Sequence, residues 1–115
     1  ELARQLSSRG MNRLEAGEAE KAEPLIRKAA EHVPEDLLYT VQLGRVLLAR
    51  QKFEEAAAQF KKVLLAMPES PNSANWLDEA WAGLKDPEGR QQDWQSIVDA
   101  HPDAVIPREH LNAPR

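Results

Sequence analysis

Amphipathic stretches, in which apolar and polar residues recur with the spacing of a helix, run through the chain and end at short breaks. Residues that favour strands never alternate for long enough to predict a sheet, whereas helix-favouring Ala, Leu, Glu, Gln, Arg and Lys dominate. The chain is therefore predicted to be all-α. The predicted helices cover, roughly, residues 2–16, 18–32, 36–50, 52–66, 71–84 and 87–100.

Three equally spaced prolines mark a fixed period. The step from Pro34 to Pro68 equals the step from Pro68 to Pro102, and each proline follows an amphipathic stretch. Proline cannot continue a helix and biases the residue before it out of the α region, so each marks a helix end. Other residues recur at the same offset: Gly10 and Gly44; Ala22 and Ala56; Ile26, Phe60 and Trp94; Ala29, Val63 and Ile97; Leu43 and Leu77. A period of this length is typical of a helical repeat array.

Each period divides into two helices at a short break. The breaks lie at residues 16–18, 50–52 and 85–88. In the third break, Asp86 is expected to cap the next helix, and Pro87 suits a first helical turn. Because the connecting loops are short, neighbouring helices are expected to pack antiparallel.

The recurring residues have expected packing roles. Small residues should stand where the two helices of a pair approach most closely, at Gly10, Ala22, Gly44 and Ala56. A bulky series should fill the space between one pair and the next, at Ile26, Phe60 and Trp94. A single pair cannot bury its apolar face alone, so stacked pairs are expected to share one continuous core.

Composition and charge narrow the function classes. The chain has 19 acidic and 15 basic residues, well mixed, for a formal net charge of −4. We therefore expect no nucleic-acid binding, which usually needs a basic face. No apolar run is long enough to insert directly into a membrane. The first residue, Glu1, indicates an excised segment or a removed leader. A soluble protein of the cytoplasm or of the periplasm fits the sequence equally well.

No constellation of residues predicts catalysis, a metal site or a cofactor. The chain has no cysteine, and nothing brings His32, His101 and His110 together with carboxylates as metal binding requires. The serines lack a neighbouring His–Asp pair or a nucleophile-elbow pattern. The five glycines form no phosphate-binding loop. We therefore expect a protein that is not an enzyme.

Over about residues 3–102 the chain resembles the tetratricopeptide repeat family. The pattern that carries the resemblance consists of the small residues at Gly10, Ala22, Ala29, Gly44 and Ala56, the large apolar Leu43 and Phe60, and the closing prolines. The resemblance implies an all-α, right-handed superhelical solenoid of three antiparallel helix pairs. Residues 1–115 would form a single module, with repeats at about 3–36, 37–70 and 71–104.

The third repeat departs from the pattern, because Asp78 replaces the glycine and Arg90 replaces the alanine. Its helix pair is therefore expected to pack with a wider gap or at a different angle. Residues 105–115 are expected to form a short tail or an incomplete cap, which their prolines limit to about one turn around Arg108–Leu111. Trp76 belongs either to a degenerate end repeat or to a ligand surface.

The resemblance also implies a concave groove lined by the first helix of each repeat, which would bind a peptide or a helix of a partner protein. The predicted groove residues are Arg4, Ser8, Met11, Leu38, Gln42, Arg45, Asn72, Asn75, Trp76 and Glu79, with Ser7 and Val41 on the same faces. The arginines supply cations, Glu79 opposes them, and Met11, Leu38 and Trp76 supply apolar contacts. The Lys, Asn and Arg clamp that holds chaperone tails in this family is absent.

Two functions remain open. The first is a non-catalytic protein–protein interaction scaffold that uses the groove. The second is an architectural segment of a longer solenoid of this family, for example in a bacterial envelope or polysaccharide-export assembly, with self-association through the array ends. A solvent-facing Trp76 would favour the first function, and an exposed apolar face at either end would favour the second.

Overall fold

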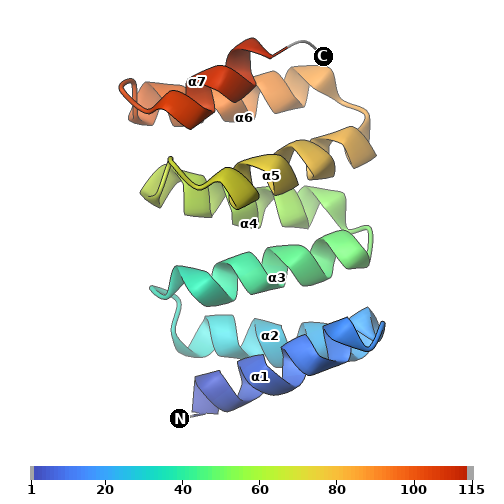
Figure 1. The fold of residues 1–115 in the computed structure, drawn as a ribbon. Coiled ribbons are helices and arrows are strands. Elements are labelled where there is room, and N and C mark those ends of the chain that lie inside the picture. The colour runs from blue at the N-terminus through green and yellow to red at the C-terminus, as the bar shows by residue number, and fades with distance from the viewer. Residues whose placement is uncertain (1, 114–115) are drawn as a thin grey trace.

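The structure, a computed structural model, describes residues 2–113, so Glu1 and the last two residues of the predicted tail, Pro114 and Arg115, lie outside the described part. Within residues 2–113 the chain forms seven helices and no strand. These are α1 (Leu2–Glu15), α2 (Ala19–His32), α3 (Leu37–Ala49), α4 (Phe53–Ala66), α5 (Pro71–Leu84), α6 (Pro87–Ala100) and α7 (Val105–Asn112). They are stacked in chain order from the N-terminus to the C-terminus (Figure 1).

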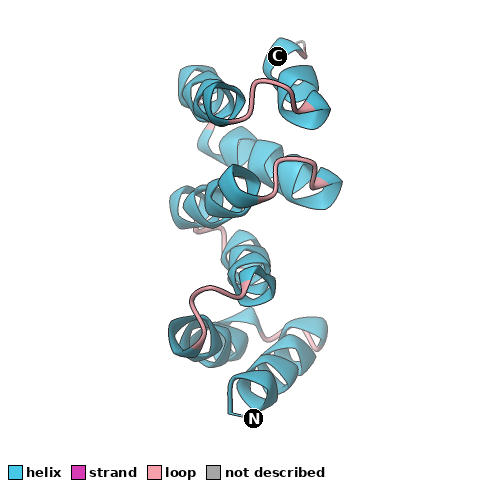
Figure 2. Cartoon of the chain, turned by 90° about the vertical axis from the view of Figure 1, so that its left-hand side faces the viewer, coloured by secondary structure: helices cyan, strands magenta, loops and turns pink. Residues whose placement is uncertain are grey.

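The helices form two layers. The first helices of the pairs, α1, α3 and α5, lie with α7 toward the viewer in Figure 1, and α2, α4 and α6 lie behind them. Figure 2 shows the same stack from the side, with extents of 39 × 27 × 17 Å. Neighbours within the first layer contact one another in the order α1, α3, α5, α7. The predicted all-α solenoid of three antiparallel helix pairs is confirmed.

The turns inside the three pairs share one backbone feature. Gly17, Gln51 and Lys85 all have positive φ, of 80°, 60° and 55°, and they follow one another at the period of the prolines. A left-handed residue at this place reverses the chain directly after a helix. The predicted cap is also present, because the Asp86 carboxylate accepts a hydrogen bond from the Gly89 amide at 3.0 Å. Local chemistry thus explains where the second helices begin.

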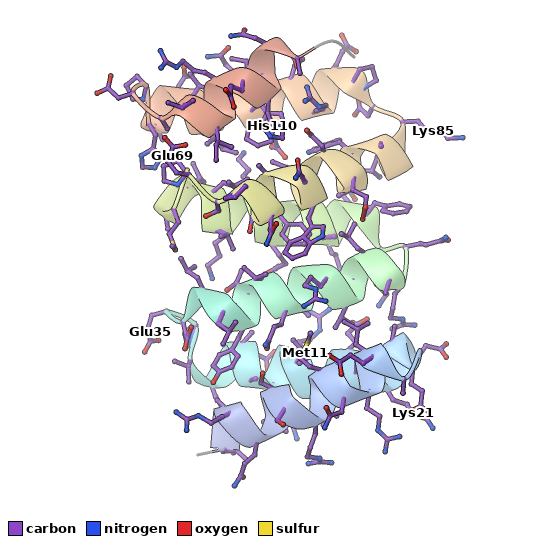
Figure 3. All side chains as sticks on the ribbon, viewed as in Figure 1. Met11, Lys21, Glu35, Glu69, Lys85 and His110 are labelled. Atoms are coloured by element: carbon purple, nitrogen blue, oxygen red, sulfur yellow. The ribbon has the colours of Figure 1, made fainter. Side chains whose placement is uncertain are left out.

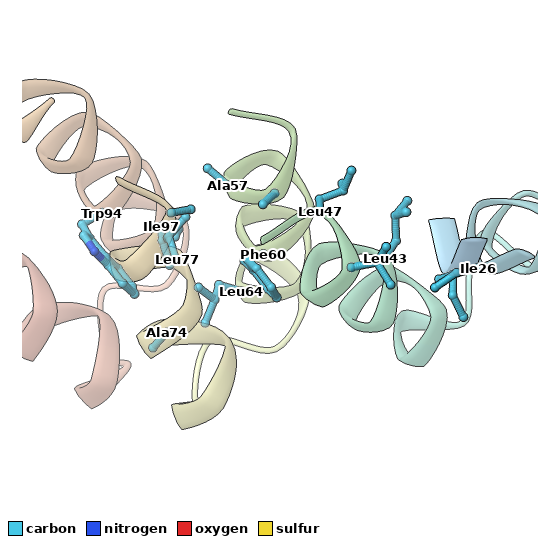
Figure 4. Close-up of a cluster of buried hydrophobic side chains, with 14 residues drawn as sticks. Ile26, Leu43, Leu47, Ala57, Phe60, Leu64, Ala74, Leu77, Trp94 and Ile97 are labelled. Atoms are coloured by element: carbon cyan, nitrogen blue, oxygen red, sulfur yellow. The ribbon is translucent and has the colours of Figure 1, made fainter. Parts of the chain in front are cut away.

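A continuous core runs between the layers from Ile26 to Trp94 (Figure 4). Ile26, Phe60 and Trp94, the predicted bulky series, are fully buried. A Cβ atom added at Gly10 would lie 2.5 Å from the Ile26 side chain, and one added at Gly44 would lie 2.6 Å from the Phe60 ring. The glycines therefore stand at close approaches within each pair, as expected, and the bulky residue of the same pair fills the space.

The third pair packs differently from the first two. α5 and α6 come close along a shorter stretch, in line with the wider gap expected from Asp78 and Arg90. The two residues also bond to each other, since Arg90 Nε donates to Asp78 Oδ1 at 2.8 Å. The indole N–H of Trp94 donates to the same oxygen at 2.7 Å. A polar cluster therefore replaces the contact between small residues that closes the other pairs.

The C-terminal cap is longer than the one turn expected around Arg108–Leu111. Helix α7 has eight residues, because Pro107 lies in its first turn, where a backbone N–H has no partner within the helix. Leu111 lies one period after Leu77, so α7 continues the repeat as the first helix of a fourth unit. This recurrence of leucine is the signal that could have predicted the longer helix, and the sequence analysis missed it.

Two carboxylates hold the ends of α7, and Figure 3 labels one of them, Glu69, together with His110. Glu69 accepts hydrogen bonds from the amides of Val105 at 2.8 Å and Ile106 at 2.9 Å, and these bonds lower the pKa of Glu69. At the other end, Asp78 Oδ2 forms a 2.6 Å hydrogen bond with His110 Nδ1. The cap is thus fixed by one residue from the loop between α4 and α5 and by one residue from α5.

A third carboxylate joins the first pair to the second. Glu23 on α2 accepts hydrogen bonds from Arg27 at 2.8 Å, from Arg50 at 2.8 Å and from Lys52 at 3.1 Å. Its side chain is only 9% exposed. Burial by itself would raise the pKa of Glu23, but the three hydrogen bonds outweigh burial and lower the pKa from 4.5 to about 2.

Candidate functional site

The ten predicted groove residues lie on α1, α3 and α5, the helices of the first layer. Within each helix most of them are three or four residues apart and so share one face, while Asn75 directly precedes Trp76. Six of them are exposed, namely Arg4, Ser8, Leu38, Asn72, Asn75 and Glu79. Four are half-buried, namely Met11, Gln42, Arg45 and Trp76. The predicted face thus combines exposed and half-buried side chains on each of the three helices.

A hydrogen bond joins α1 to α3 beneath this face. The Ser7 hydroxyl donates to Oε1 of Gln42 at 2.6 Å, and Ser7 itself is buried. Ser7 thus holds Gln42 in place rather than offering its own hydroxyl to a ligand. The amide NH₂ of Gln42 takes no part in this bond.

Trp76 is held between an aromatic ring and a cation. Its ring centroid lies 5.6 Å from that of Phe60, with the planes inclined by 35°. The Arg45 guanidinium carbon lies 5.4 Å from the centre of the Trp76 ring, within the range of a cation–π interaction. Phe60 is fully buried whereas Trp76 is half-buried, so Trp76 belongs both to the core and to the groove surface.

The sequence analysis predicted only three of the six residues that line the hollow in the groove. Arg45, Trp76 and Glu79 surround a hollow of about 280 Å³. Its other lining residues are Leu14, Leu48 and Ala49, which the prediction missed. The signal that could have found two of them is the period, since Leu14 and Leu48 are equivalent positions of the first and second repeats. The remaining predicted residues lie on the same face but outside this hollow.

A larger hollow, of about 450 Å³, lies at the C-terminal end of the array. Its lining includes Trp81, Ala82, Pro87 and Ala113. Helices α3 and α5 have 13 and 14 residues, whereas α7 has eight. The hollow opens beside Ala113, directly after α7 ends, so α7 leaves this apolar surface uncovered.

Other kinds of site find no support in residues 2–113. That part of the chain contains no group of three or more His, Cys, Asp or Glu side chains placed to hold a metal ion. None of its helices combines the length and the apolar character needed to cross a bilayer.

Comparison with known proteins finds one matching family and two solved structures with a similar fold. The tetratricopeptide repeat family model matches residues 13–84, which is more than half of the chain. No curated protein matches the chain. A solved structure described as a MamA RS-1 ArsTM double mutant superimposes with a TM-score of 0.72 at 22% identity. The match covers 95% of this chain but only 61% of that one.

A second solved structure is the second TPR domain of human RPAP3, determined by NMR in complex with the HSP70 peptide SGPTIEEVD. It superimposes with a TM-score of 0.70 at 18% identity, over 96% of this chain and 92% of that chain. At such identities the two structures show a shared fold and no more. With the match over residues 13–84 and the repeated helix pairs, they lead to one conclusion: this chain belongs to the tetratricopeptide repeat family.

Proposed function

We propose that the chain is a non-catalytic scaffold that binds a segment of a partner protein on the groove face of α1, α3 and α5. The observation that carries the proposal is the hollow of about 280 Å³ beside Trp76. A half-buried tryptophan next to an arginine combines the two residue types that contribute most at protein interfaces. Modules of this family typically act through such interactions, and the similar RPAP3 domain holds a peptide.

Rigidity of the site supports the same function. Trp76 is fixed by Phe60 below and by Arg45 beside it, and Gln42 is fixed by Ser7. A partner that binds here orders few side chains of the scaffold, so less conformational entropy is lost on association. Leu38, 56% exposed near the start of α3, offers a second apolar contact on the same face.

Replacing Trp76 with alanine is expected to weaken partner binding by about tenfold or more. The measurement uses peptides selected from a displayed random library on the wild-type protein, with affinities taken from fluorescence polarisation. The matched control is Lys62→Ala on the exposed surface of α4, which should bind these peptides as the wild type does. Equal affinity of the wild type and of Trp76→Ala would show that the peptides bind elsewhere, and the groove function would be abandoned.

The C-terminal hollow favours a second candidate, an architectural function in which another unit stacks on Trp81 and Pro87. The N-terminal end has a smaller hollow, of about 350 Å³, lined by Leu2, Gln5, Leu6, Ser8 and Arg9. Arg9 and Arg13, both exposed, stand one period before the buried Leu43 and Leu47 that pack against the preceding pair. The larger C-terminal hollow is therefore the stronger candidate for stacking.

Light scattering over a concentration series separates the two candidates. If the terminal hollow mediates stacking, the wild type should self-associate, and Trp81→Ser should reduce this association while Trp76→Ala leaves it unchanged. A wild type that stays monomeric at all concentrations would remove self-stacking through this end, and the groove function would stand alone.

A further inference from the structure

Two opposite charges occupy equivalent positions in neighbouring repeats. Arg45 on α3 and Glu79 on α5 lie one period apart, and both line the groove hollow. Among the ion pairs within residues 2–113, none involves either of them. Each charge therefore lacks a partner within the described chain and is able to pair with a bound segment.

The Arg45 guanidinium lies over an aromatic ring. Its carbon lies 5.4 Å from the centre of the Trp76 ring, and Arg45 is half-buried. A guanidinium is planar, and its N–H groups point outward along its edges. When an aromatic ring covers one face, these edges remain free to donate two hydrogen bonds to a carboxylate. Arg45 thus presents a carboxylate-binding edge directly beside the hollow.

The surface of the hollow away from the charges is apolar. Leu14, Leu48, Ala49 and the Trp76 ring line it beside the polar surface of Arg45 and Glu79, and its volume of about 280 Å³ leaves room for about one large side chain. An apolar group that enters the hollow therefore comes to lie with Arg45 and Glu79 both on its margin. The three features together define a compound site with one apolar and two charged contacts.

The order of the helices sets the order of these contacts. Because α3 and α5 are neighbours in the first layer, a segment that runs along the array meets Arg45 and Glu79 one after the other. Neighbouring packed helices have axes about 10 Å apart, and an extended chain advances about 3.3 Å per residue. The two complementary charges in an extended partner are thus roughly three residues apart.

We infer that the groove selects a partner segment in which one large apolar side chain lies between an acidic and a basic residue, with the acidic residue over α3 and the basic residue over α5. This inference rests on the proposed function. A uniformly acidic segment would place a carboxylate against Glu79, and a uniformly basic one would place a cation against Arg45. Like charges in such contact disfavour a partner, so the pair excludes both classes of segment.

The test is a charge exchange, with a displayed random peptide library as the probe. The library is selected separately on the wild type and on the double variant Arg45→Glu, Glu79→Arg. Peptides selected on the wild type should carry one acidic and one basic residue around an apolar one in a single order, and the double variant should select the reverse order. Exchanging the two charges within a wild-type peptide should weaken its binding to the wild type by about tenfold.

A matched control exchanges Glu54 and Lys62 on the exposed surface of α4 and should select the same peptides as the wild type. If the double variant does not fold, as judged by circular dichroism, the single variants Arg45→Gln and Glu79→Gln replace it. Each should relax the charge preference at one peptide position only. The same charge order on both proteins, or no order, would overturn the inference.

The proposed function is tested separately, by measuring how tightly the same peptides bind Trp76→Ala. Peptides that lack a charge order but lose affinity for Trp76→Ala would overturn the charge inference and leave groove binding intact. Peptides that bind Trp76→Ala as well as they bind the wild type would overturn groove binding and the inference together.

Discussion

Replacing Gly44 with alanine is expected to lower the free energy of unfolding by about 2 kcal/mol. The added Cβ atom would lie 2.6, 2.7 and 3.0 Å from three carbons of the Phe60 ring. Phe60 is fully buried and packs against Trp76, so its ring has no solvent to move into. Overpacking of this kind costs about 1–3 kcal/mol or more, against a gain of up to about 1 kcal/mol from replacing a helical glycine.

Urea unfolding measures this loss, and Gly83→Ala is the matched control. A Cβ atom at Gly83 would also lie 2.6 Å from a phenylalanine ring, that of Phe53. Phe53 is half-buried at the start of α4, so its ring can move toward solvent, and we expect a change of less than about 1 kcal/mol. Equal losses at the two glycines would show that burial of the ring does not decide the cost.

Gly44→Ala should also affect the groove. A shift of Phe60 moves the surface on which Trp76 rests, because the two ring centroids are only 5.6 Å apart. Peptide binding is therefore expected to weaken in Gly44→Ala even where the protein remains folded. Phe60, one of the recurring core residues, thus also positions Trp76 in the proposed site.

Acidification is expected to destabilise the protein through Glu23. Its pKa in the folded state, about 2, lies below the value of 4.5 for an unperturbed glutamate. The unfolded state therefore binds the proton more readily, so the stabilisation by Glu23 is complete above pH 4.5 and is lost as the pH falls toward 2. A pKa difference of this size corresponds to at most about 3 kcal/mol.

Urea unfolding of the wild type and of Glu23→Gln at a series of pH values measures this contribution. The variant should be about 2–3 kcal/mol less stable at neutral pH, and the difference should shrink as the pH falls below 4.5. Glu31→Gln, on the exposed last turn of the same helix, is the control and should differ little from the wild type. A constant difference between the wild type and Glu23→Gln at every pH would mean that the carboxylate charge is not the source of the stability.

The third repeat contains contacts that the sequence did not predict. Asp78 and Arg90 each break the pattern of small residues, and from the sequence they are two separate irregularities. In the structure they bond to each other and, with Trp94 and His110, anchor α7. The partners come from α5, α6 and α7, so no local pattern connects them.

The groove was predictable as a face but not as a site. Helical spacing and the family resemblance placed ten residues on one side of α1, α3 and α5, and the structure puts them on those helices. Their roles differ because of neighbours beyond their own helix. Ser7 fixes Gln42, Phe60 supports Trp76, and Leu14 and Leu48 complete the hollow. Binding by these residues, like the exact repeat boundaries, stays a prediction.

The sequence alone determined the first six helices, their pairing and their stacking. Prolines, breaks and the recurring small and bulky residues share one period, and adjacent pairs meet through the same positions each time. Tertiary structure alone decided the buried pairing of Glu23, the bonding of Asp78 with Arg90, and the hollow beside Trp76. The physical reason is that hydrogen bonding, burial and the shape of a hollow depend on side chains from several helices, whose distances only the packed fold defines.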